Sequence, residues 1–307
     1  MNKISKLIAQ KGGYETVLNE LEKLSGSELN SLLLELFGKR SKKISPAELL
    51  RQFEKNRFAA PSTVHPIAFK ELELRCLKLA ESKNFNPIIL SPLTPLGTCS
   101  VVGFVDQNNV VSASRGTEIV SDATNVFALL IVGEYRKKRN KSIIKYATTQ
   151  RNVRSQGISN PGFTPHFGLF CLASGGLDTG NFSFKIENLL EHINVHLSLL
   201  SDEFAKDKLF IKFLLKDNNE SFHRTLEEHS RELNNSIRIK IERQSNPGNY
   251  YKLVQFKFFL EHEGKEINLS DGGFVDWTQK LIQNKKHRLL ISGVGTELIY
   301  KIKHDQI

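Results

Sequence analysis

Three stretches near the end of the 307-residue chain decide its fold: YYKLVQFKFFL at 250–260, DGGFVD at 271–276 and ISGVGTEL at 291–298. The first is rich in aromatic residues and predicts a strand over about 250–260, which Glu263-Gly264 turns back into a second strand at about 265–269. Gly272-Gly273 is predicted to end this hairpin, before a helix over about 274–284 and a strand over about 288–292. This part of the chain therefore predicts an antiparallel hairpin, a helix and a returning strand.

Upstream, apolar runs and helix-like segments alternate along the chain. Pro87–Pro92 reads as an edge strand, because a proline cannot donate to a central ladder. We expect further strands at about 100–105, 109–114, 143–149, 167–174, 208–215 and 236–243, and helices at about 66–83, 122–135 and 185–200. The predicted fold class is α+β, with a mainly antiparallel sheet flanked by helices.

A small helical unit is predicted before this sheet, over residues 1–60. Apolar residues recur at helical spacing over about 14–37, with a break at Ser25-Gly26-Ser27, which indicates two short helices. Ser45-Pro46-Ala47-Glu48 is a helix start, since the Ser45 hydroxyl can cap free amides and Pro46 suits the first helical position. Pro61 and Pro66 then interrupt the chain, so we divide it into a unit at 1–60 and a domain at 61–307.

The composition is that of an ordinary globular protein, with 39% hydrophobic and 25% charged side chains. The three cysteines, Cys76, Cys99 and Cys171, form no CxxC pair, so neither a disulfide framework nor a zinc site is predicted. Residues 1–10 lack the apolar core of a signal peptide, and the longest apolar run, at 127–132, is too short to span a bilayer. We expect a cytoplasmic protein with no membrane partner.

The chain is basic, with 43 lysines and arginines against 33 acidic residues and a formal charge of +10. This balance favours polyanionic partners such as RNA through long-range attraction and counterion release. The densest basic run comprises Arg136, Lys137, Lys138, Arg139, Lys141 and Lys145. A solvated loop between a helix and a strand is the simpler interpretation of this run, since charge runs usually face water.

No phosphate-binding loop, dinucleotide fingerprint, HExxH or GxSxG motif occurs, which removes the commonest nucleotide-binding and hydrolase classes. Tyr250 and Tyr251 can instead form the wall of a small-molecule pocket, and Gly272 and Gly273 allow another segment or a ligand to approach the sheet closely. Each pair also has a plainer interpretation, as one core and one surface tyrosine and as an ordinary turn.

In order and spacing, these stretches resemble the closing third of histidyl-tRNA synthetases, which are class II aminoacyl-tRNA synthetases. There an Asp-Tyr-Tyr strand precedes a Gly-Gly-Arg-Tyr-Asp turn, a helix and a Gly-x-Glu-Arg turn. The matching positions are Asn249-Tyr250-Tyr251, Gly272-Gly273-Phe274-Val275-Asp276 and Gly295-Thr296-Glu297-Leu298. The resemblance spans about 66–303, implies the class II catalytic fold, and implies that Tyr250, Tyr251, Gly272 and Gly273 bind substrate.

Two upstream segments continue the resemblance. Asn86–Pro95 is similar to the first class II motif, with Pro92 as its proline, which implies a homodimer. Asp122-Ala123-Thr124 resembles the Arg-Pro-Glu-x-Thr segment whose acid binds the substrate amine, although the Arg-Pro is missing. Asp122 and Thr124 are therefore implied substrate ligands.

Val153-Arg154-Ser155-Gln156 resembles the second class II motif, Phe-Arg-x-Glu. The planar fork of Arg154 could pair with an α-phosphate during adenylate formation, so Arg154 is the implied catalytic residue; the alternative is an ordinary pair with an acid. An ATP site with magnesium would then comprise Arg154, Gln156, Phe167 and Glu297. The same segment, with Phe182-Ser183-Phe184, also resembles alanyl-tRNA synthetase, so the class II resemblance is more specific than its subtype.

Several residues that make this fold a synthetase are replaced. The third class II motif needs an arginine after Glu297 to hold the γ-phosphate of ATP, and the chain has Leu298, which cannot imitate that charged fork. The histidyl-type arginine is absent from Asn246–Asn249, Phe274-Val275 stands for Arg-Tyr, and no anticodon-binding domain is expected after Tyr300. These losses argue against ordinary aminoacylation of tRNA.

Three functions stay open. The first is a degenerate histidyl-tRNA-synthetase-like paralog that binds an amino acid, a nucleotide or a tRNA-like RNA in a regulatory role; the regulatory partner of ATP phosphoribosyltransferase is a family precedent. The second is a noncanonical adenylate-forming ligase with an unusual acceptor, in which Arg151 or Lys145 substitutes for the lost arginine. The third is a dimeric scaffold.

Three histidines have a plain and a functional interpretation, and one tryptophan has only a plain one. His166 could donate to a ligand phosphate, but a histidine at a strand end is more often simply hydrogen-bonded. His192 and His196, four apart on one helix, have the spacing of metal ligands but lack accompanying carboxylates or cysteines. Trp277, the only tryptophan, is expected to pack its helix on the sheet.

Overall fold

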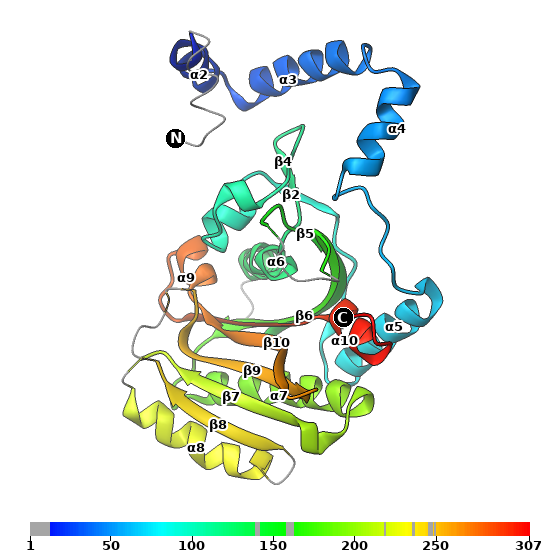
Figure 1. Ribbon diagram of the computed structural model, residues 1–307. Helices are drawn as coiled ribbons and strands as arrows, with labels where there is room; N and C mark the ends of the chain where they lie inside the picture. The colour runs from blue at the N-terminus through cyan, green and yellow to red at the C-terminus, as the bar shows by residue number, and fades with distance from the viewer. Residues whose placement is uncertain are drawn as a thin grey trace.

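The computed structural model describes residues 13–138, 142–157, 163–217, 219–234, 237–244, 248 and 250–307. An eight-stranded sheet runs through the centre of the molecule (Figure 1), and its pairs β1–β5 and β7–β8 are parallel while the others are antiparallel. In spatial order its strands are β1 (Asn86–Pro87), β5 (Ile144–Val153), β6 (His166–Leu177), β11 (His287–Val294), β10 (Lys265–Val275), β9 (Lys252–His262), β7 (Leu209–Leu215) and β8 (Arg238–Arg243). The predicted α+β class, with a mainly antiparallel sheet, is confirmed.

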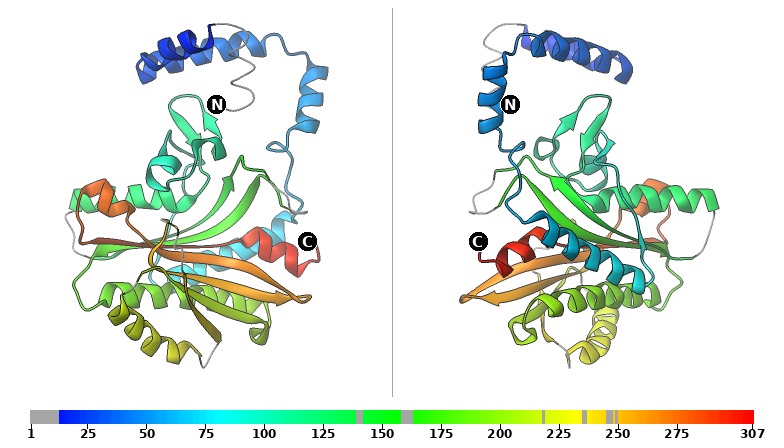
Figure 2. Two further views of the ribbon diagram at one scale, coloured as in Figure 1. Left: turned by 60° about the vertical axis from the view of Figure 1, so that its left-hand side comes forward. Right: turned by 90° about the vertical axis from the view of Figure 1, so that its right-hand side faces the viewer.

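Helices cover both faces of this sheet and bury a separate apolar cluster on each (Figure 2). One face packs against α5 (Pro66–Ser82), α7 (Ser183–Glu203), α8 (Glu220–Asn234) and α10 (Thr296–Lys303). The other packs against α6 (Ala123–Lys138) and α9 (Trp277–Ile282), where Trp277 is buried as expected. Along β10 Phe274 joins the first cluster and Val275 the second, because neighbouring strand residues face opposite sides.

A second, three-stranded sheet, in order β2 (Leu93–Pro95), β4 (Thr117–Ile119) and β3 (Ser112–Ala113), sits above the α6 side. The strand predicted at 100–105 is wrong, since Thr98–Val102 forms a π-helical turn followed by a short 3-10 turn at Gln107–Asn109. The buried Glu118 carboxylate accepts hydrogen bonds from the backbone amides of Gly97 and Cys99, both at 2.8 Å, and so fixes this turn. Of the edge strand predicted at 87–92, only Pro87 lies in a strand, at the end of the two-residue strand β1.

The prediction that Gly272-Gly273 ends the hairpin is also wrong. Both glycines lie inside β10, paired with β9 on one side and β11 on the other. A Cβ on Gly272 would stand 2.5 Å from the Phe256 ring, and one on Gly273 would stand 2.7 Å from the Tyr251 ring. The glycines therefore let two aromatic rings approach the strand closely, which is what the residue type indicated.

Helix α8 was not predicted. It is strongly polar, but Phe222, Leu226 and Leu233 recur on one side and are buried against the sheet. The Asn219 side chain caps its start by accepting a hydrogen bond from the Phe222 amide at 3.0 Å. A wide charged face masked this narrow apolar stripe in the sequence pattern.

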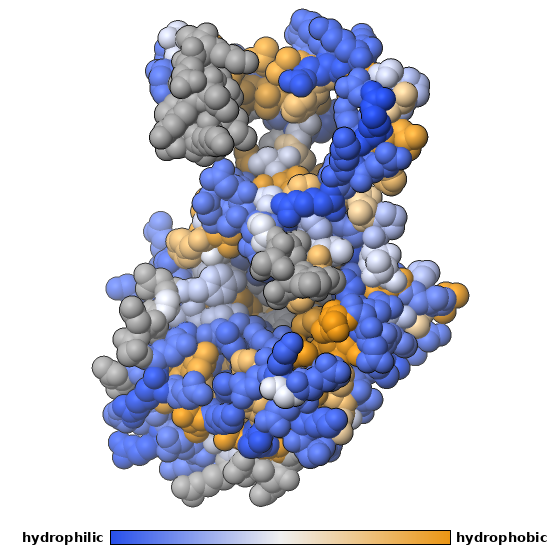
Figure 3. Space-filling view, viewed as in Figure 1, coloured by the Kyte–Doolittle hydropathy of each residue, from blue (hydrophilic) through white to orange (hydrophobic). Residues whose placement is uncertain are grey.

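The N-terminal arm, defined as α2 (Tyr14–Glu22), α3 (Gly26–Ser41) and α4 (Pro46–Lys55), stands apart from the sheet (Figure 1). Its predicted helices are confirmed, and Ser45 accepts a hydrogen bond from the Glu48 amide; Ser25 and Glu28 form a reciprocal capping box at the start of α3. No residue of these three helices is buried, and hydrophobic side chains reach the surface along α3 and α4 (Figure 3). The division of the chain at residue 60 stays a prediction.

Within the described residues, no helix combines the length and the apolar character that crossing a membrane requires.

Candidate functional site

A cavity of about 720 Å³ opens on the α6 side of the sheet, between the inner strands β6, β9, β10 and β11 and the start of α10. Four residues of the predicted nucleotide site line it, namely Arg154, Gln156, Phe167 and Glu297. Four residues of the predicted substrate site line it as well, namely Asp122, Thr124, Tyr250 and Tyr251. Gly272 and Gly273 do not line it, and they act beneath it by accommodating the Phe256 and Tyr251 rings.

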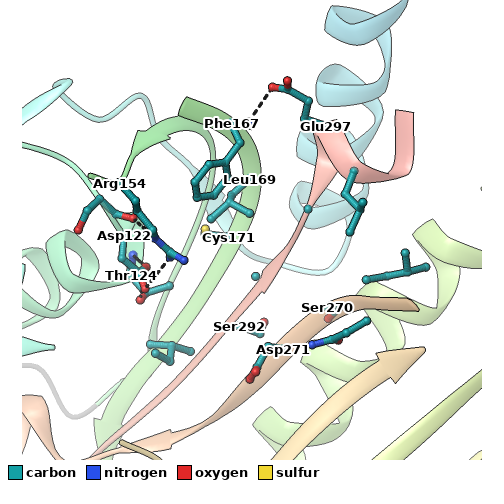
Figure 4. A pocket seen from close by; sticks show the side chains of 18 of the residues that line it. Asp122, Thr124, Arg154, Phe167, Leu169, Cys171, Ser270, Asp271, Ser292 and Glu297 are labelled. Atoms are coloured by element: carbon teal, nitrogen blue, oxygen red, sulfur yellow. Dashed lines mark hydrogen bonds and ion pairs between the residues drawn. The ribbon is translucent and has the colours of Figure 1, made fainter. Parts of the chain in front are cut away.

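Arg154 follows the last residue of β5 and extends over the cavity (Figure 4). Its Nε donates to the Ser121 carbonyl at 3.0 Å, its Nη2 lies 3.9 Å from Asp122 Oδ2, and its guanidinium lies 5.2 Å from the centroid of the Phe167 ring. The side chain is 37% exposed, so part of its fork remains accessible from the cavity. Arg154 is therefore compatible with both interpretations of the sequence, an ordinary pair with an acid and contact with a ligand, because Asp122 lies beside it and it still faces a ligand-sized space.

Asp122 begins α6 and uses one oxygen for the local structure. Its Oδ1 accepts hydrogen bonds from the Thr124 amide at 2.9 Å and the Thr124 hydroxyl at 2.7 Å, which confirms the predicted helix cap. Its Oδ2 faces the Tyr250 hydroxyl at 3.4 Å and the Arg154 fork. The second oxygen is therefore directed at the cavity, next to a cation.

Both tyrosines line the cavity because they precede β9 and lie in a bend, where side chains do not alternate as they would in a strand. Their rings pack edge to face, 4.7 Å apart, and the Tyr250 ring packs on Trp277. Burial, with Asp122 acting on Tyr250 and Asp271 on Tyr251, raises the pKa of both phenols well above the usual value. Both hydroxyls are therefore neutral donors at physiological pH.

A second polar group, centred on Asp271 of β10, was not selected by sequence reasoning. Its carboxylate accepts from Gln255 Nε2 at 2.9 Å and lies 3.8 Å from Lys257 Nζ. Burial raises the pKa of Asp271 above its ordinary value, against the opposing effect of Tyr251 and Lys257. The alternation of β9 and β10 could have revealed it, since Asp271 lies opposite Lys257 in register.

Lys216 and Lys301 also line the cavity and were likewise missed. Burial lowers the pKa of Lys216. Lys301 is buried and pairs with Glu297, four residues earlier on α10, at 3.1 Å. That spacing of four on one helix was a signal in the sequence.

Glu297 is tied to protein groups on both of its oxygens. Oε1 accepts from the Ser62 hydroxyl at 2.7 Å, and Oε2 accepts from the Gly168 amide at 3.2 Å and lies 3.0 Å from Arg151 Nη1. Burial acts to raise the pKa of Glu297, but Ser62, Arg151 and Lys301 outweigh it and hold the pKa below its usual range. The side chain is 3% exposed, so Glu297 anchors the rim rather than presenting a free carboxylate.

The two cations suggested as substitutes for the lost arginine lie elsewhere. Lys145 pairs with Glu191 of α7 at 2.5 Å, on the opposite side of the sheet from α6. Arg151 is engaged by Glu297 and donates to His166 Nδ1 at 2.7 Å, so the protonated Nε2 of His166 donates to the Ala60 carbonyl at 2.6 Å. His166 is thus the simply hydrogen-bonded strand-end histidine.

The two spaced histidines of α7 bind serines. His192 bridges Ser174 at 3.0 Å and Ser292 at 2.8 Å, and His196 bridges Ser292 at 3.0 Å and Ser270 at 2.5 Å. Burial lowers the pKa of His192 well below its usual value and that of His196 to about 3, so both rings are neutral. Among the described residues no group of three or more histidine, cysteine or acidic side chains is arranged to hold a metal ion.

Of the positions Asn246–Asn249, Gly248 lines the cavity and the other three lie outside the described residues. Of the basic run, Arg136 caps the end of α9 by donating to the Leu281 carbonyl at 2.9 Å, and Arg139 and Lys141 lie outside the described residues.

For ATP, the described lining offers one accessible fork, on Arg154, and two lysines. The position that follows the motif glutamate is occupied by Leu298, which packs against the apolar cluster of the α7 face. The described lining therefore presents one accessible arginine fork, at Arg154, and not the second fork that the resemblance implies.

No protein-family profile matches the chain, and no curated protein matches it in sequence. Solved structures do match. An ATP phosphoribosyltransferase regulatory subunit/histidyl-tRNA synthetase from Bacillus halodurans aligns over 79% of this chain and 82% of its own, with a TM-score of 0.56 and 12% identity. The chain has a class II aminoacyl-tRNA synthetase-like fold.

Two further structures with this class II-like fold give the same result at 12% identity. The histidyl-tRNA synthetase of S. aureus aligns over 80% of this chain and 69% of its own, with a TM-score of 0.58. A protein named as a threonyl-tRNA synthetase from Aeropyrum pernix aligns over 78% and 60%, with a TM-score of 0.60. Identities this low establish the fold of the chain and not its chemistry.

Proposed function

We propose that this class II-like protein binds a free amino acid in its cavity and acts as a regulatory paralog rather than as a tRNA synthetase. The observation that carries the proposal is the pairing of Arg154 and Asp122 at one end of the cavity, 3.9 Å apart, with opposite charges directed at the same space. An α-amino acid carries a carboxylate and an ammonium group two bonds apart. Arg154 complements the first group, and Asp122 with the Tyr250 hydroxyl complements the second.

The remaining walls suit a side chain. Phe167, Leu169 and Ile291 supply apolar surface, and Asp271 with Gln255 supplies polar groups further in. Ligand sites of this kind combine mostly apolar walls with few polar groups that fix orientation. Leu298 in place of the motif arginine, and the engagement of Glu297 by Arg151, favour retained binding over retained adenylate chemistry.

The experiment is calorimetric titration with each of the twenty amino acids supplied singly. We expect at least one to bind, and we expect Arg154→Ala to weaken it by about 10-fold or more, because a charge-assisted pair contributes about 1.5–3 kcal/mol. Arg40→Ala, an exposed arginine of α3, is the matched control and should leave the affinity unchanged. Failure of all twenty to bind contradicts the proposal.

An adenylate-forming ligase is the second candidate, favoured by Lys216, which lines the cavity together with Arg154. ATP with magnesium would be its cofactor, with Arg154 at the α-phosphate and Gln156 and Phe167 beside the nucleotide. Pyrophosphate exchange scanned across the amino acids tests it. Exchange that is lost in Arg154→Ala supports the ligase, and a flat scan rejects it.

We also propose a homodimer through the segment that resembles the first class II motif. Ile89 is 99% exposed there, and Leu93 and Leu96 nearby are 42% and 54% exposed. Apolar side chains gathered on a surface mark interaction sites. Sedimentation of the protein should give a dimer that Ile89→Lys converts to monomer, and a wild-type monomer at all concentrations would reject the dimer.

RNA is the remaining partner that the charge of +10 favours. Binding to a tRNA mixture should weaken steeply as salt rises if lysines and arginines contact phosphates. An affinity that does not change with salt would contradict RNA binding through lysines and arginines.

A further inference from the structure

The segment at residues 57–62, called the strap below, joins α4 of the N-terminal arm to the core. Three polar groups of the strap, namely the Arg57 guanidinium, the Ala60 carbonyl and the Ser62 hydroxyl, bind three different segments at the edge of the cavity. Arg57 donates from Nη2 to the Ser155 carbonyl at 2.6 Å and from Nη1 to the Gln156 carbonyl at 3.1 Å. The Ala60 carbonyl accepts from His166 at 2.6 Å, and the Ser62 hydroxyl donates to Glu297 at 2.7 Å.

The strap's partners are the residues next to the ligand groups. Gln156 and Glu297 line the cavity themselves. Ser155 directly follows Arg154, and His166 directly precedes Phe167, the ring over which the Arg154 guanidinium lies. Because Ser155 and Gln156 follow Arg154 directly in the chain, a backbone shift at Arg154 on anion binding would move the two carbonyls that accept from Arg57.

Within the described residues, few other contacts fix the position of the arm. No residue of α2, α3 or α4 is buried, and the linker to α5 passes along the ends of β5 and β6 (Figure 2). One direct hydrogen bond from the arm to the core is the Gly116 amide donating to Asn30 Oδ1 at 3.1 Å. The two hydrogen bonds from Arg57 are stronger than this neutral one, because their donor carries a full charge.

We propose that the strap couples the cavity to the N-terminal arm, so that a ligand held at Arg154 changes the position of α2, α3 and α4 relative to the sheet. The identity of that ligand as an amino acid rests on the proposed function above. The coupling itself rests on the bonds of Arg57, Ala60 and Ser62. Because coupling between two sites is reciprocal, a change in the strap must also change ligand affinity.

The first test needs no ligand. Cys76, Cys99 and Cys171 are all buried, so spin labels can be placed at Leu49→Cys on α4 and Lys265→Cys in the β9–β10 hairpin with little background labelling. The distance distribution between the labels should broaden in Arg57→Ala and in Arg154→Ala. Arg51→Ala, on α4 beside the strap, is the matched control and should not broaden it. Fluorescence of the buried Trp277 checks that each variant keeps its core.

Unchanged distributions in Arg57→Ala and Arg154→Ala overturn the proposal, whether or not any ligand is known. If only Arg57→Ala broadens the distribution, the strap holds the arm but is not linked to the cavity, and the coupling is again refuted. A failure of all amino acids to bind contradicts the proposed function and leaves this first result valid.

The second test uses the twenty amino acids supplied singly. The one that binds should shift the label distance in the wild-type protein, and its affinity should fall about fivefold or more in Arg57→Ala, within the usual range of coupling between sites. Arg57→Lys, which keeps the charge and one of the two bonds, should restore part of that loss. Binding without any shift of the arm refutes the coupling while sustaining the amino-acid site.

Discussion

The N-terminal arm and the eight-stranded sheet are built from the same chain by different means. Helices α2, α3 and α4 bury no side chain, and their ends are defined by local groups such as the Ser25–Glu28 capping box. The sheet instead depends on contacts between residues far apart in the chain, such as the Phe69 ring against Gly168. The arm therefore owes its helices to propensity and caps, and the sheet owes its order to burial.

This difference assigns the two regions different tasks. A cavity that holds a small ligand needs walls fixed by packing, and Arg154 and Asp122 are held by β5 and α6 on the sheet. An element that changes position needs few buried contacts, and the arm meets that condition. The strap, at residues 57–62, joins the arm to the region that carries the cavity.

The largest contrast should come from removing matched rings in the two regions. Phe256→Ala deletes a fully buried ring against Gly272 and should lower the free energy of unfolding by about 3–5 kcal/mol. Phe53→Ala deletes a ring of α4 that is 52% exposed and should change it by less than about 0.5 kcal/mol. Urea unfolding followed by Trp277 fluorescence measures both. Equal losses would erase the distinction between the two regions.

Between about pH 6.5 and 5, acid should destabilise the sheet through two buried histidines. The neutral, buried His192 and His196 have lowered pKa values, about 3 for His196, whereas unfolded imidazoles protonate near pH 6.5. The unfolded chain thus binds more protons below about pH 6.5, and stability should fall with pH by about 1.4 kcal/mol per unit for each ring until the folded pKa is reached. His196→Gln, which can still bond both serines, should reduce this slope by one ring's share between pH 5 and 6. A slope unchanged by the substitution would show that His196 does not contribute.

The smallest expected effect lies in the arm. Ser45→Ala removes the hydroxyl that caps α4 and should cost that helix about 1 kcal/mol, because an exposed helix has no packing to replace the cap. Amide hydrogen exchange over residues 46–55 should quicken while exchange in β6 and β11 stays the same. Faster exchange in both places would mean that the arm is part of the core's cooperative unit.

The sequence was sufficient to predict features that depend on neighbouring residues or on short motifs in a fixed order. The caps at Ser45 and Asp122, the hairpin at Glu263-Gly264 and the helices of the arm follow from residues a few positions apart. The class II resemblance came from the order of short motifs over a long range, and the solved structures confirm that fold.

It was insufficient where the outcome depends on which distant residue fills a space. The π-helical turn at Thr98–Val102 depends on the buried Glu118, and the continuation of β10 through Gly272-Gly273 depends on two rings from another segment. Asp271 and Lys216 come together in the cavity only when β10 and the end of β7 are placed. The engagement of Glu297 by Ser62 could not be expected, because no pattern links positions 235 residues apart.

Calorimetric titration of the wild-type protein and of Arg154→Ala with amino acids tests most directly whether Arg154 and Asp122 form an amino-acid site. We predict that an amino acid binds the wild type and that two analogues, its amide, which lacks the carboxylate, and its deamino acid, which lacks the ammonium group, bind about 10-fold or more weakly, as expected for a lost charge-assisted pair. Arg154→Ala should bind the intact amino acid as weakly as the wild type binds the amide. Equal binding of the amino acid to both proteins, or no binding to either, would contradict the claim that Arg154 and Asp122 form an amino-acid site.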